Sequence, residues 1–314
     1  YGLPIGTLMG KHDGICGGNN CICRDTGICY CMVCVSERIR ERGMKIYEQT
    51  CGNLLVKSKL PGADWVINPY VGCTHRCRYC YASFMKRFYH YEEKWGDFMA
   101  VKKGFLKGID KIQDDQVILI GSVTDAYQPL EKKYQCTCTI LQNLQNCKGM
   151  VEILTKSKLI LRDVELLKKI PRIRVGISLN TLDDSFRRSM EPGASSIMER
   201  LQTLQALKEN DIETYLFVSP IFPIITDIQL IIQETKGLAD TYYFENLNLR
   251  GDYKNRILEY ISEQFPEYEH TYKQIYCDNN LEYWEKCKQQ IEELAKIHNI
   301  KAKEYFYHSK IKKQ

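Results

Sequence analysis

The sequence lacks long apolar runs and has only a small excess of positive charge. No stretch of its 314 residues approaches the ~20 apolar residues that a membrane-spanning helix requires, so we expect no membrane partner. The opening residues, Tyr1–Ile5, have no basic-then-apolar signal pattern, which favours a cytoplasmic location. The net charge of +5 permits an anionic partner but is too small to identify one.

Cysteine, by contrast, is abundant. Ten of the fifteen cysteines fall in the first eighty residues, many of them at C-x-C or C-x2-C spacing. Such tight spacing suits a metal ion or a cluster better than the disulfide framework of a secreted protein.

Three cysteines, Cys73, Cys77 and Cys80, stand together at C-x3-C-x2-C spacing. Three thiolates on one loop can bind three irons of a cubane cluster and leave the fourth iron open to a small molecule. A zinc site completed by a fourth ligand from elsewhere is the alternative. The aromatic Tyr79 before the last cysteine and the Pro/Gly-containing loop entry Asn68–Gly72 favour the cluster.

Residues 1–60 form a separate cysteine-rich opening segment. Glycines between its cysteines allow the chain to wrap closely around a metal. Four of its thiolates could bind a second iron–sulfur cluster or a structural zinc, and free buried cysteines are the third and least favoured interpretation. The candidate ligands are Cys16, Cys21, Cys23, Cys29, Cys31 and Cys34. The charged stretch Ser36–Arg42 that follows them is predicted to be a surface helix.

Residues 61–250 alternate apolar strands with helical runs such as Ile197–Asn210 and Ile228–Leu238. This order predicts an α/β domain with a parallel sheet and crossover helices. Polar residues follow the strand ends, where parallel α/β barrels place their chemistry. The predicted strands are Val117–Ile120, Val151–Leu154, Arg174–Ser178, Thr214–Val218 and Thr241–Phe244.

Two further helical regions are expected. The stretch Tyr81–Phe88 mixes aromatic and basic residues, and we expect its aromatic rings to pack inward while Lys86 and Arg87 face solvent. Residues 251–314 are predicted to be helical and charged, with an amphipathic helix at Leu281–His298. Their basic tail, Lys301–Gln314, is interpreted as a solvated surface in preference to a nucleic-acid contact.

The run Asn68–Ala82 resembles the radical SAM superfamily, and within it the branch related to spore photoproduct lyase. The resemblance covers about residues 66–250. The opening segment, through Cys29–Cys34 and Glu41–Gly43, resembles the narrower radical SAM "mobile pair" subgroup, whose members are encoded beside a second radical SAM protein. Further matching motifs are Gly121–Glu131, Leu154–Ser157, Leu161–Asp163, Ser178–Leu182 and Glu191–Ala194.

The resemblance implies a partial (β/α)6 barrel with a 4Fe–4S cluster on Cys73, Cys77 and Cys80. S-adenosylmethionine (SAM) would bind the fourth iron and be cleaved to a 5′-deoxyadenosyl radical that takes hydrogen from a substrate. The implied partners are a flavodoxin-like or ferredoxin-like electron donor and a second radical SAM protein.

The strand ends supply the candidate SAM contacts. Ser122, Thr124 and Asp125 are candidates for the methionine amino group of SAM. Lys156 is the candidate for its carboxylate, and Ser178 and Asn180 are candidates for the ribose or the carboxylate. For the hydroxyl groups, capping of the neighbouring backbone is the alternative role. The candidates are Ser122, Thr124, Asp125, Lys156, Ser178 and Asn180.

Candidate substrate contacts are less specific. For Arg162, the alternative is an ion pair with Asp163 that has no catalytic role. The candidates are Tyr127, Arg162, Glu191, Tyr243, Glu245 and Asn246.

One departure from the lyase pattern affects the expected reaction. Spore photoproduct lyase has a hydrogen-donating cysteine near the loop after the second strand, but Val117–Asp125 contains none and Cys136 and Cys138 lie downstream. This argues against repair of a thymine photoproduct. Modification or repair of nucleic acid, modification of a peptide, protein or small molecule, and a non-catalytic zinc or iron–sulfur module therefore remain competing functions.

Overall fold

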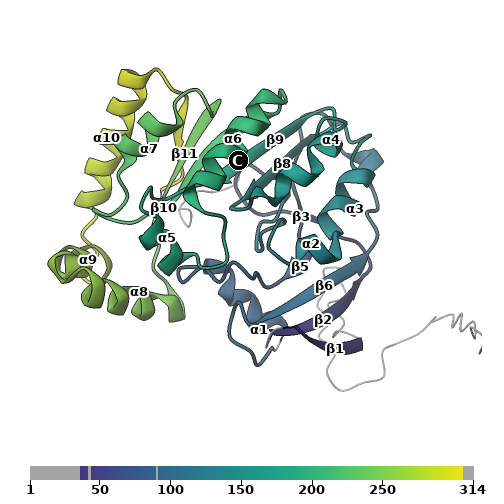
Figure 1. Cartoon of the computed structure of the whole chain (residues 1–314), viewed down its shortest axis with the longest axis horizontal. Coiled ribbons are helices and arrows are strands. Elements are labelled where there is room, and N and C mark those ends of the chain that lie inside the picture. Colours follow the sequence, from purple (N-terminus) through teal and green to yellow (C-terminus); the bar gives the residue numbers. More distant parts are fainter. Residues whose placement is uncertain (1–35, 42–43, 90, 307–314) are drawn as a thin grey trace, which may run out of the picture. The chain divides into compact units, whose positions relative to one another are not determined.

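The computed structural model describes residues 36–41, 44–89 and 91–306 (Figure 1). These residues belong to one compact unit, Val35–Gln314. The six candidate ligands Cys16 to Cys34 lie outside the described residues, so their predicted metal site stays a prediction.

The main sheet has eight strands in the order β12-β11-β10-β9-β8-β7-β4-β3. All neighbours in it are parallel except β3, which runs antiparallel to β4. Successive strands along the chain are neighbours from β7 to β12, as is usual where short connections join consecutive elements. The strands are β3 (Leu55–Lys57), β4 (Trp65–Ile67), β7 (Val117–Ile120), β8 (Met150–Thr155), β9 (Ile173–Ser178), β10 (Glu213–Ile221), β11 (Thr241–Asn246) and β12 (Ala302–Glu304). The predicted α/β class and parallel sheet are confirmed.

Helices connect the parallel strands and cover one face of the sheet (Figure 1). Local capping defines some of their ends: α6 begins with a capping box formed by Ser196 and Glu199, and Asp227 caps α7. The helices after β7 are α2 (Glu131–Tyr134), α3 (Cys136–Asn143), α4 (Val164–Leu167), α5 (Asp184–Met190), α6 (Ile197–Glu209), α7 (Ile228–Thr235), α8 (Gly251–Gln264), α9 (Glu269–Tyr276) and α10 (Glu282–His298). Short 3-10 helices lie at η2 (Ile109–Lys111), η3 (Lys158–Asp163) and η4 (Pro266–Tyr268).

The two faces of the sheet differ in burial. Residues on the helix-covered face, such as Ile153 and Ile177, are fully buried, whereas Leu154 and Phe217 on the other face are only half-buried. Alternation of side chains along each strand produces this pattern. The second face therefore stays accessible between the strand ends.

An ion pair between Arg174 and Glu152 covers part of this second face of the sheet. The Arg174 guanidinium lies 2.5 Å from a Glu152 carboxylate oxygen and over the rings of Tyr215 and Tyr243, at 5.6 and 5.8 Å from their centroids. Gly176 makes room for the Tyr215 ring, because a Cβ there would lie 2.1 Å from Cζ. These residues form a floor beneath the carboxyl ends of the strands.

A second sheet has the order β1-β2-β6-β5 and contains β1 (Ser36–Glu41), β2 (Met44–Cys51), β6 (Phe98–Gly104) and β5 (Tyr70–Val71). The helix predicted at Ser36–Arg42 is wrong, since Ser36–Glu41 is a strand paired antiparallel with β2. The pairing supplies backbone hydrogen bonds that no local charge pattern reveals.

The helical stretch after the cysteine loop is confirmed as η1 (Tyr81–Met85) and α1 (Lys86–Tyr89). The inward packing expected of its aromatic rings is wrong for Tyr81 and Phe88, which are 54% and 68% exposed. The face that this stretch buries consists of the small residues Ala82 and Ser83 in η1, and α1 buries none of its residues.

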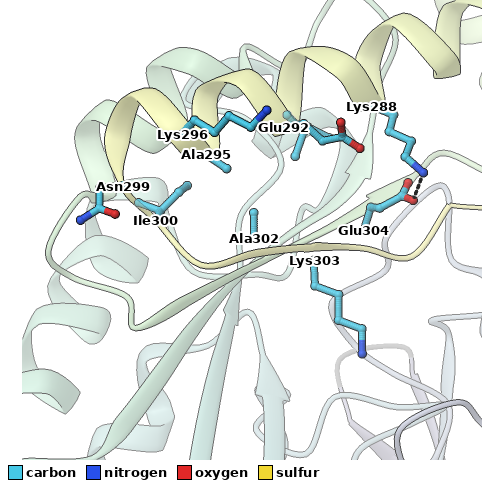
Figure 2. A pocket seen from close by; sticks show the side chains of 10 residues that line it. Lys288, Glu292, Ala295, Lys296, Asn299, Ile300, Ala302, Lys303 and Glu304 are labelled. Carbon is cyan, nitrogen blue, oxygen red and sulfur yellow. Dashed lines mark ion pairs between the residues drawn. The ribbon is translucent and has the colours of Figure 1, made fainter.

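A cavity of about 660 Å³ lies between α10 and β12 (Figure 2). The Lys288 ammonium and the Glu304 carboxylate, 2.8 Å apart, pair at its rim. Within the described ranges, no helix is long and apolar enough to cross a bilayer.

Candidate functional site

The cysteine loop follows β5 directly. Gly72 has φ +91°, and a Cβ there would lie 2.6 Å from the Phe98 carbonyl oxygen, so glycine is required for this tight entry. Burial raises the pKa of Cys73 to about 12 and raises the pKa of Cys77 and Cys80 as well. The Cys80 thiol also raises the pKa values of the other two.

The three thiols of this loop are the kind of donor set that a cubane cluster takes. In the described part of the chain, no three His, Cys, Asp or Glu side chains are placed around one metal-ion position. In a cubane cluster each thiolate binds a different iron, so the sulfurs stand farther apart than around one zinc. Cys73, Cys77 and Cys80 would thus hold three irons and leave one without a protein ligand.

Asp125 joins the ends of two strands to the cysteine loop. Its Oδ1 accepts hydrogen bonds from Tyr127 N at 2.8 Å and Thr155 Oγ1 at 2.7 Å. Its Oδ2 accepts one from Lys156 N at 2.8 Å and lies 3.0 Å from His75 Nε2. Burial alone would raise the pKa of Asp125, but His75 and these donors hold it well below its usual range. All four of these partners are protein atoms, so the contacts seen for Asp125 join β8 and its own loop to the cysteine loop.

Two of the candidate hydroxyl groups also bind protein atoms. Thr124 donates to the carbonyl oxygen of Gly72 at 2.6 Å. Ser122 Oγ accepts a hydrogen bond from Asn68 Nδ2 at 2.9 Å, and its own proton stays available for a ligand. The backbone contact that is the alternative role for these hydroxyls is therefore seen for Thr124, whereas the Ser122 hydroxyl contacts a side chain.

Lys156, at the end of β8, presents a cation to the same space. Its ammonium lies 6.0 Å from the Tyr79 ring centroid and has no hydrogen bond or ion pair with any residue that the structure describes. Burial would lower the pKa of Lys156, but the Glu191 and Cys77 charges raise it above its usual value. The ammonium thus stays charged and can bind an anionic ligand.

The end of β9 contributes Ser178 and Asn180. The Ser178 hydroxyl donates to the carbonyl oxygen of Ser219 at 3.2 Å. The Asn180 side chain is buried, and its Nδ2 donates to the Tyr79 hydroxyl at 3.4 Å. Its Oδ1 has no hydrogen-bond donor among the described residues. A buried acceptor without a donor indicates a place for a ligand.

The turn after α5 docks onto the cysteine loop through its backbone. Gly193 N donates to His75 O at 3.0 Å, and His75 Nδ1 lies 2.8 Å from Gly193 O. A Cβ at Gly193 would lie 2.2 Å from Thr74 O. Sequence reasoning did not select His75 or Gly193, although both stand inside motifs that it quoted.

A buried ion pair stands behind this turn. Glu191 and Arg200 have side chains that are 0% and 1% exposed, and Glu191 also accepts a hydrogen bond from the Tyr79 hydroxyl. Arg200 belongs to α6 and was not predicted.

The candidate substrate residues have different partners and locations in the structure. Arg162 pairs with Asp163 at 2.7 Å and with Glu131 at 2.8 Å, so the pair named in the alternative interpretation is present. Glu191 is engaged by Arg200, and Tyr243 belongs to the floor. Glu245 accepts a hydrogen bond from Ser219 at 2.5 Å near the strand ends.

The other candidates are less accessible or lie elsewhere. Tyr127 and Asn246 are buried. Cys136 and Cys138 are half-exposed at the start of α3.

Comparison with known proteins places this site in a family. A model of the Radical SAM superfamily matches residues 67–231. "Uncharacterized protein MJ0683" of Methanocaldococcus jannaschii is 40% identical over 210 residues, which are 67% of this chain and 80% of that protein. "Uncharacterized protein Rv2578c" of Mycobacterium tuberculosis is 26% identical over 255 residues, 74% of each chain.

A solved structure, "Spore photoproduct lyase complexed with dinucleoside spore photoproduct", superposes with a TM-score of 0.51 at 16% identity. The superposition covers 71% of this chain and 66% of the lyase, slightly under two thirds of its length. At this identity the likeness shows the fold alone.

Proposed function

The chain belongs to the radical SAM superfamily, and we propose that it cleaves SAM reductively at a 4Fe–4S cluster and abstracts hydrogen from a substrate. The family implies the cluster and SAM. The cofactors, when bound, supply the electron transfer and the radical chemistry, while the protein binds, orients and shields them.

The residues of the site divide into two groups. Cys73, Cys77 and Cys80 would hold the cluster, and the Lys156 ammonium would pair with the SAM carboxylate. Asn180 Oδ1, together with the hydroxyl groups of Ser122 and Ser178, would bind the polar groups of SAM.

Asp125 and Thr124 would instead hold the loops in place, since their hydrogen-bonding capacity is directed at protein atoms. The half-buried face above the floor would receive the substrate.

One observation supports this proposal above the others. Three thiols, an unpaired ammonium and an unpartnered amide oxygen come from three separate segments, and the Lys156 ammonium and the Asn180 amide both lie against Tyr79 of the cysteine loop. A non-catalytic metal module would have no need of the last two.

The test compares the anaerobically reconstituted wild type with the triple variant Cys73→Ala/Cys77→Ala/Cys80→Ala. With dithionite and SAM, only the wild type should form 5′-deoxyadenosine. Failure of the wild type to form it with a full cluster would refute the proposal.

Iron analysis of the same samples tests the opening segment. We propose a second cluster or a zinc at Cys16 to Cys34. Loss of about four irons from a total of about eight would indicate a second cluster. A wild type with about four irons would leave those cysteines to zinc or to structure.

A second candidate function, modification of nucleic acid, is favoured by the surface beside the cysteines. The rings of Tyr81 and Phe84 stack at 6.5 Å, and those of Phe84 and Phe88 meet edge to face at 6.1 Å. Arg87 is exposed beside them, and residues 65–91 contain no Asp or Glu. Exposed rings and cations together suit stacked bases and phosphates. The lyase structure named above contains a dinucleoside, which agrees with this candidate.

Fluorescence anisotropy with a labelled single-stranded oligonucleotide tests this candidate. Phe88→Ala should weaken salt-sensitive binding, while Phe105→Ala, which removes a ring that is 72% exposed elsewhere, should not. Equal binding by the two variants would remove the support.

Partner proteins are proposed on family grounds. A flavodoxin-like or ferredoxin-like donor would reduce the cluster, and a second radical SAM protein would associate if the chain belongs to the mobile-pair subgroup. Copurification from the native host tests both.

A further inference from the structure

We infer that Tyr79 is a positioning residue for SAM, because its hydroxyl group orients the Asn180 amide in the site. The inference rests on the proposed function and concerns how the protein prepares the site. No sequence motif assigns a role to the Tyr79 hydroxyl, since the cluster pattern requires only an aromatic residue there.

The orientation begins at the buried ion pair. Arg200 is fixed by three groups at once: its Nε donates to Ser195 O at 3.0 Å, its Nη1 donates to Ser178 O at 3.0 Å, and its Nη2 pairs with Glu191. Burial would raise the pKa of Glu191, but Arg200 and Lys156 lower it, so the carboxylate stays ionised. An ionised carboxylate offers acceptors and no donor.

The ionised Glu191 carboxylate determines to which atom the Tyr79 hydroxyl donates its hydrogen bond. Because Glu191 can only accept, the Tyr79 hydroxyl has to donate to it. The phenol oxygen is then left as an acceptor toward its other neighbour, Asn180 Nδ2, at 3.4 Å. Of the two ends of an amide, only the NH2 group can donate. The nitrogen of Asn180 is thereby held against Tyr79.

The amide oxygen consequently faces away from the protein donors. Asn180 is held on its backbone side by the Thr226 hydroxyl, which donates to Asn180 O at 2.8 Å. Its side chain is 1% exposed, yet Oδ1 has no donor in the described ranges. Leaving a buried acceptor unsatisfied is unfavourable, and a ligand hydroxyl or ammonium group would satisfy it. SAM carries both groups, in its ribose and its amino acid part.

Lys156 supplies the complementary feature. Its unpaired ammonium lies over the Tyr79 ring, 6.0 Å from the centroid. The site thus offers one cation and one oriented acceptor around the same tyrosine. This combination fits a ligand that carries both a carboxylate and a hydrogen-bond donor.

The experiment is a double-mutant cycle on the reconstituted holoprotein. SAM dissociation constants are measured by the change in the EPR signal of the reduced cluster for wild type, Tyr79→Phe, Asn180→Ala and the double variant. Tyr79→Phe alone should raise the dissociation constant about threefold to tenfold, the effect of losing one hydrogen bond. In the Asn180→Ala background the same change should have little further effect.

Tyr242→Phe is the matched control, since Tyr242 is a buried tyrosine whose hydroxyl donates to Thr235 O at 2.8 Å outside the site. It should leave both iron content and SAM affinity at wild-type values. Equal effects of Tyr79→Phe in the two backgrounds, or no effect in either, would overturn the inference. Iron loss in Tyr79→Phe but not in Tyr242→Phe would also overturn it, because Tyr79 would then act on the cluster loop.

Different results would refute the proposed function and the inference about Tyr79. A wild type that binds no SAM and forms no 5′-deoxyadenosine removes the proposed function and the inference with it. A wild type that cleaves SAM, with a cycle that shows no coupling between the two residues, removes only the inference.

Discussion

Replacement of Gly193 by alanine tests how the cysteine loop is held. The added Cβ would lie 2.2 Å from Thr74 O and 2.8 Å from the Cα of His75. Both are backbone atoms, so no side-chain rotation relieves the contact and the loop has to move. Overpacking of this kind costs about 1–3 kcal/mol. The shift also weakens the two contacts with His75, at about 1 kcal/mol each.

The expected loss in the free energy of unfolding is therefore about 3–5 kcal/mol. Urea unfolding of the apoprotein, followed by circular dichroism, measures it. Iron content after reconstitution should fall in parallel, because the moved loop carries the three cysteines. Gly52→Ala is the control, since a Cβ there meets no atom within 4 Å. Equal stability and equal iron content in the two variants would refute this account of the loop.

Three further changes probe the scaffold. Gly176→Ala places a Cβ 2.1 Å from the buried Tyr215 ring and should lower the free energy of unfolding by about 1–3 kcal/mol; an unchanged urea midpoint would contradict the proposed floor. Ser196→Ala removes the cap of α6 and should cost about 1 kcal/mol by the same assay, with no loss meaning that the cap is dispensable. Burial would raise the pKa of Asp240, but Lys208 lowers it, so its contribution is present above the usual carboxyl pKa and lost as pH falls. Asp240→Asn should therefore destabilise more at pH ~7 than at pH ~3, and an equal loss at both would contradict the pairing.

The strands β7 to β11 were predictable because each is a short apolar run followed by polar residues, whereas β12 (Ala302–Glu304) lies in the stretch predicted to be a basic tail. The apolar run Val117–Ile120 predicts a buried strand without any knowledge of tertiary contacts, and β7 has the same bounds. The strand β1 was not predictable in this way, because charged Ser36–Glu41 is a strand only through its pairing with β2. The exposure of Phe88 likewise depends on tertiary context, since its neighbours in sequence would also suit an inward-facing ring.

The cysteine loop was predictable from spacing alone, but the part played by Asp125 was not. An aspartate after a strand is equally suited to a ligand ammonium and to protein donors. The partners that decide between them come from separate segments: Thr155 from the end of β8, Lys156 directly after it, and His75 from the cysteine loop. Spacing along the chain cannot show which donors meet a given carboxylate in space.

The buried ion pair between Glu191 and Arg200 explains why the Lys156 ammonium is left without a partner among the described residues. Glu191 and Arg200 are both essentially without exposure, and each satisfies the other, so the pair brings little net charge to the site. Lys156 is raised in pKa by Glu191 yet has no ion-pair partner in the part of the chain that the structure describes. If Arg200 were absent, Glu191 would be the natural partner of that ammonium. By engaging Glu191, Arg200 leaves the Lys156 charge available for an anion beside the three thiols, where the carboxylate of SAM is proposed to bind.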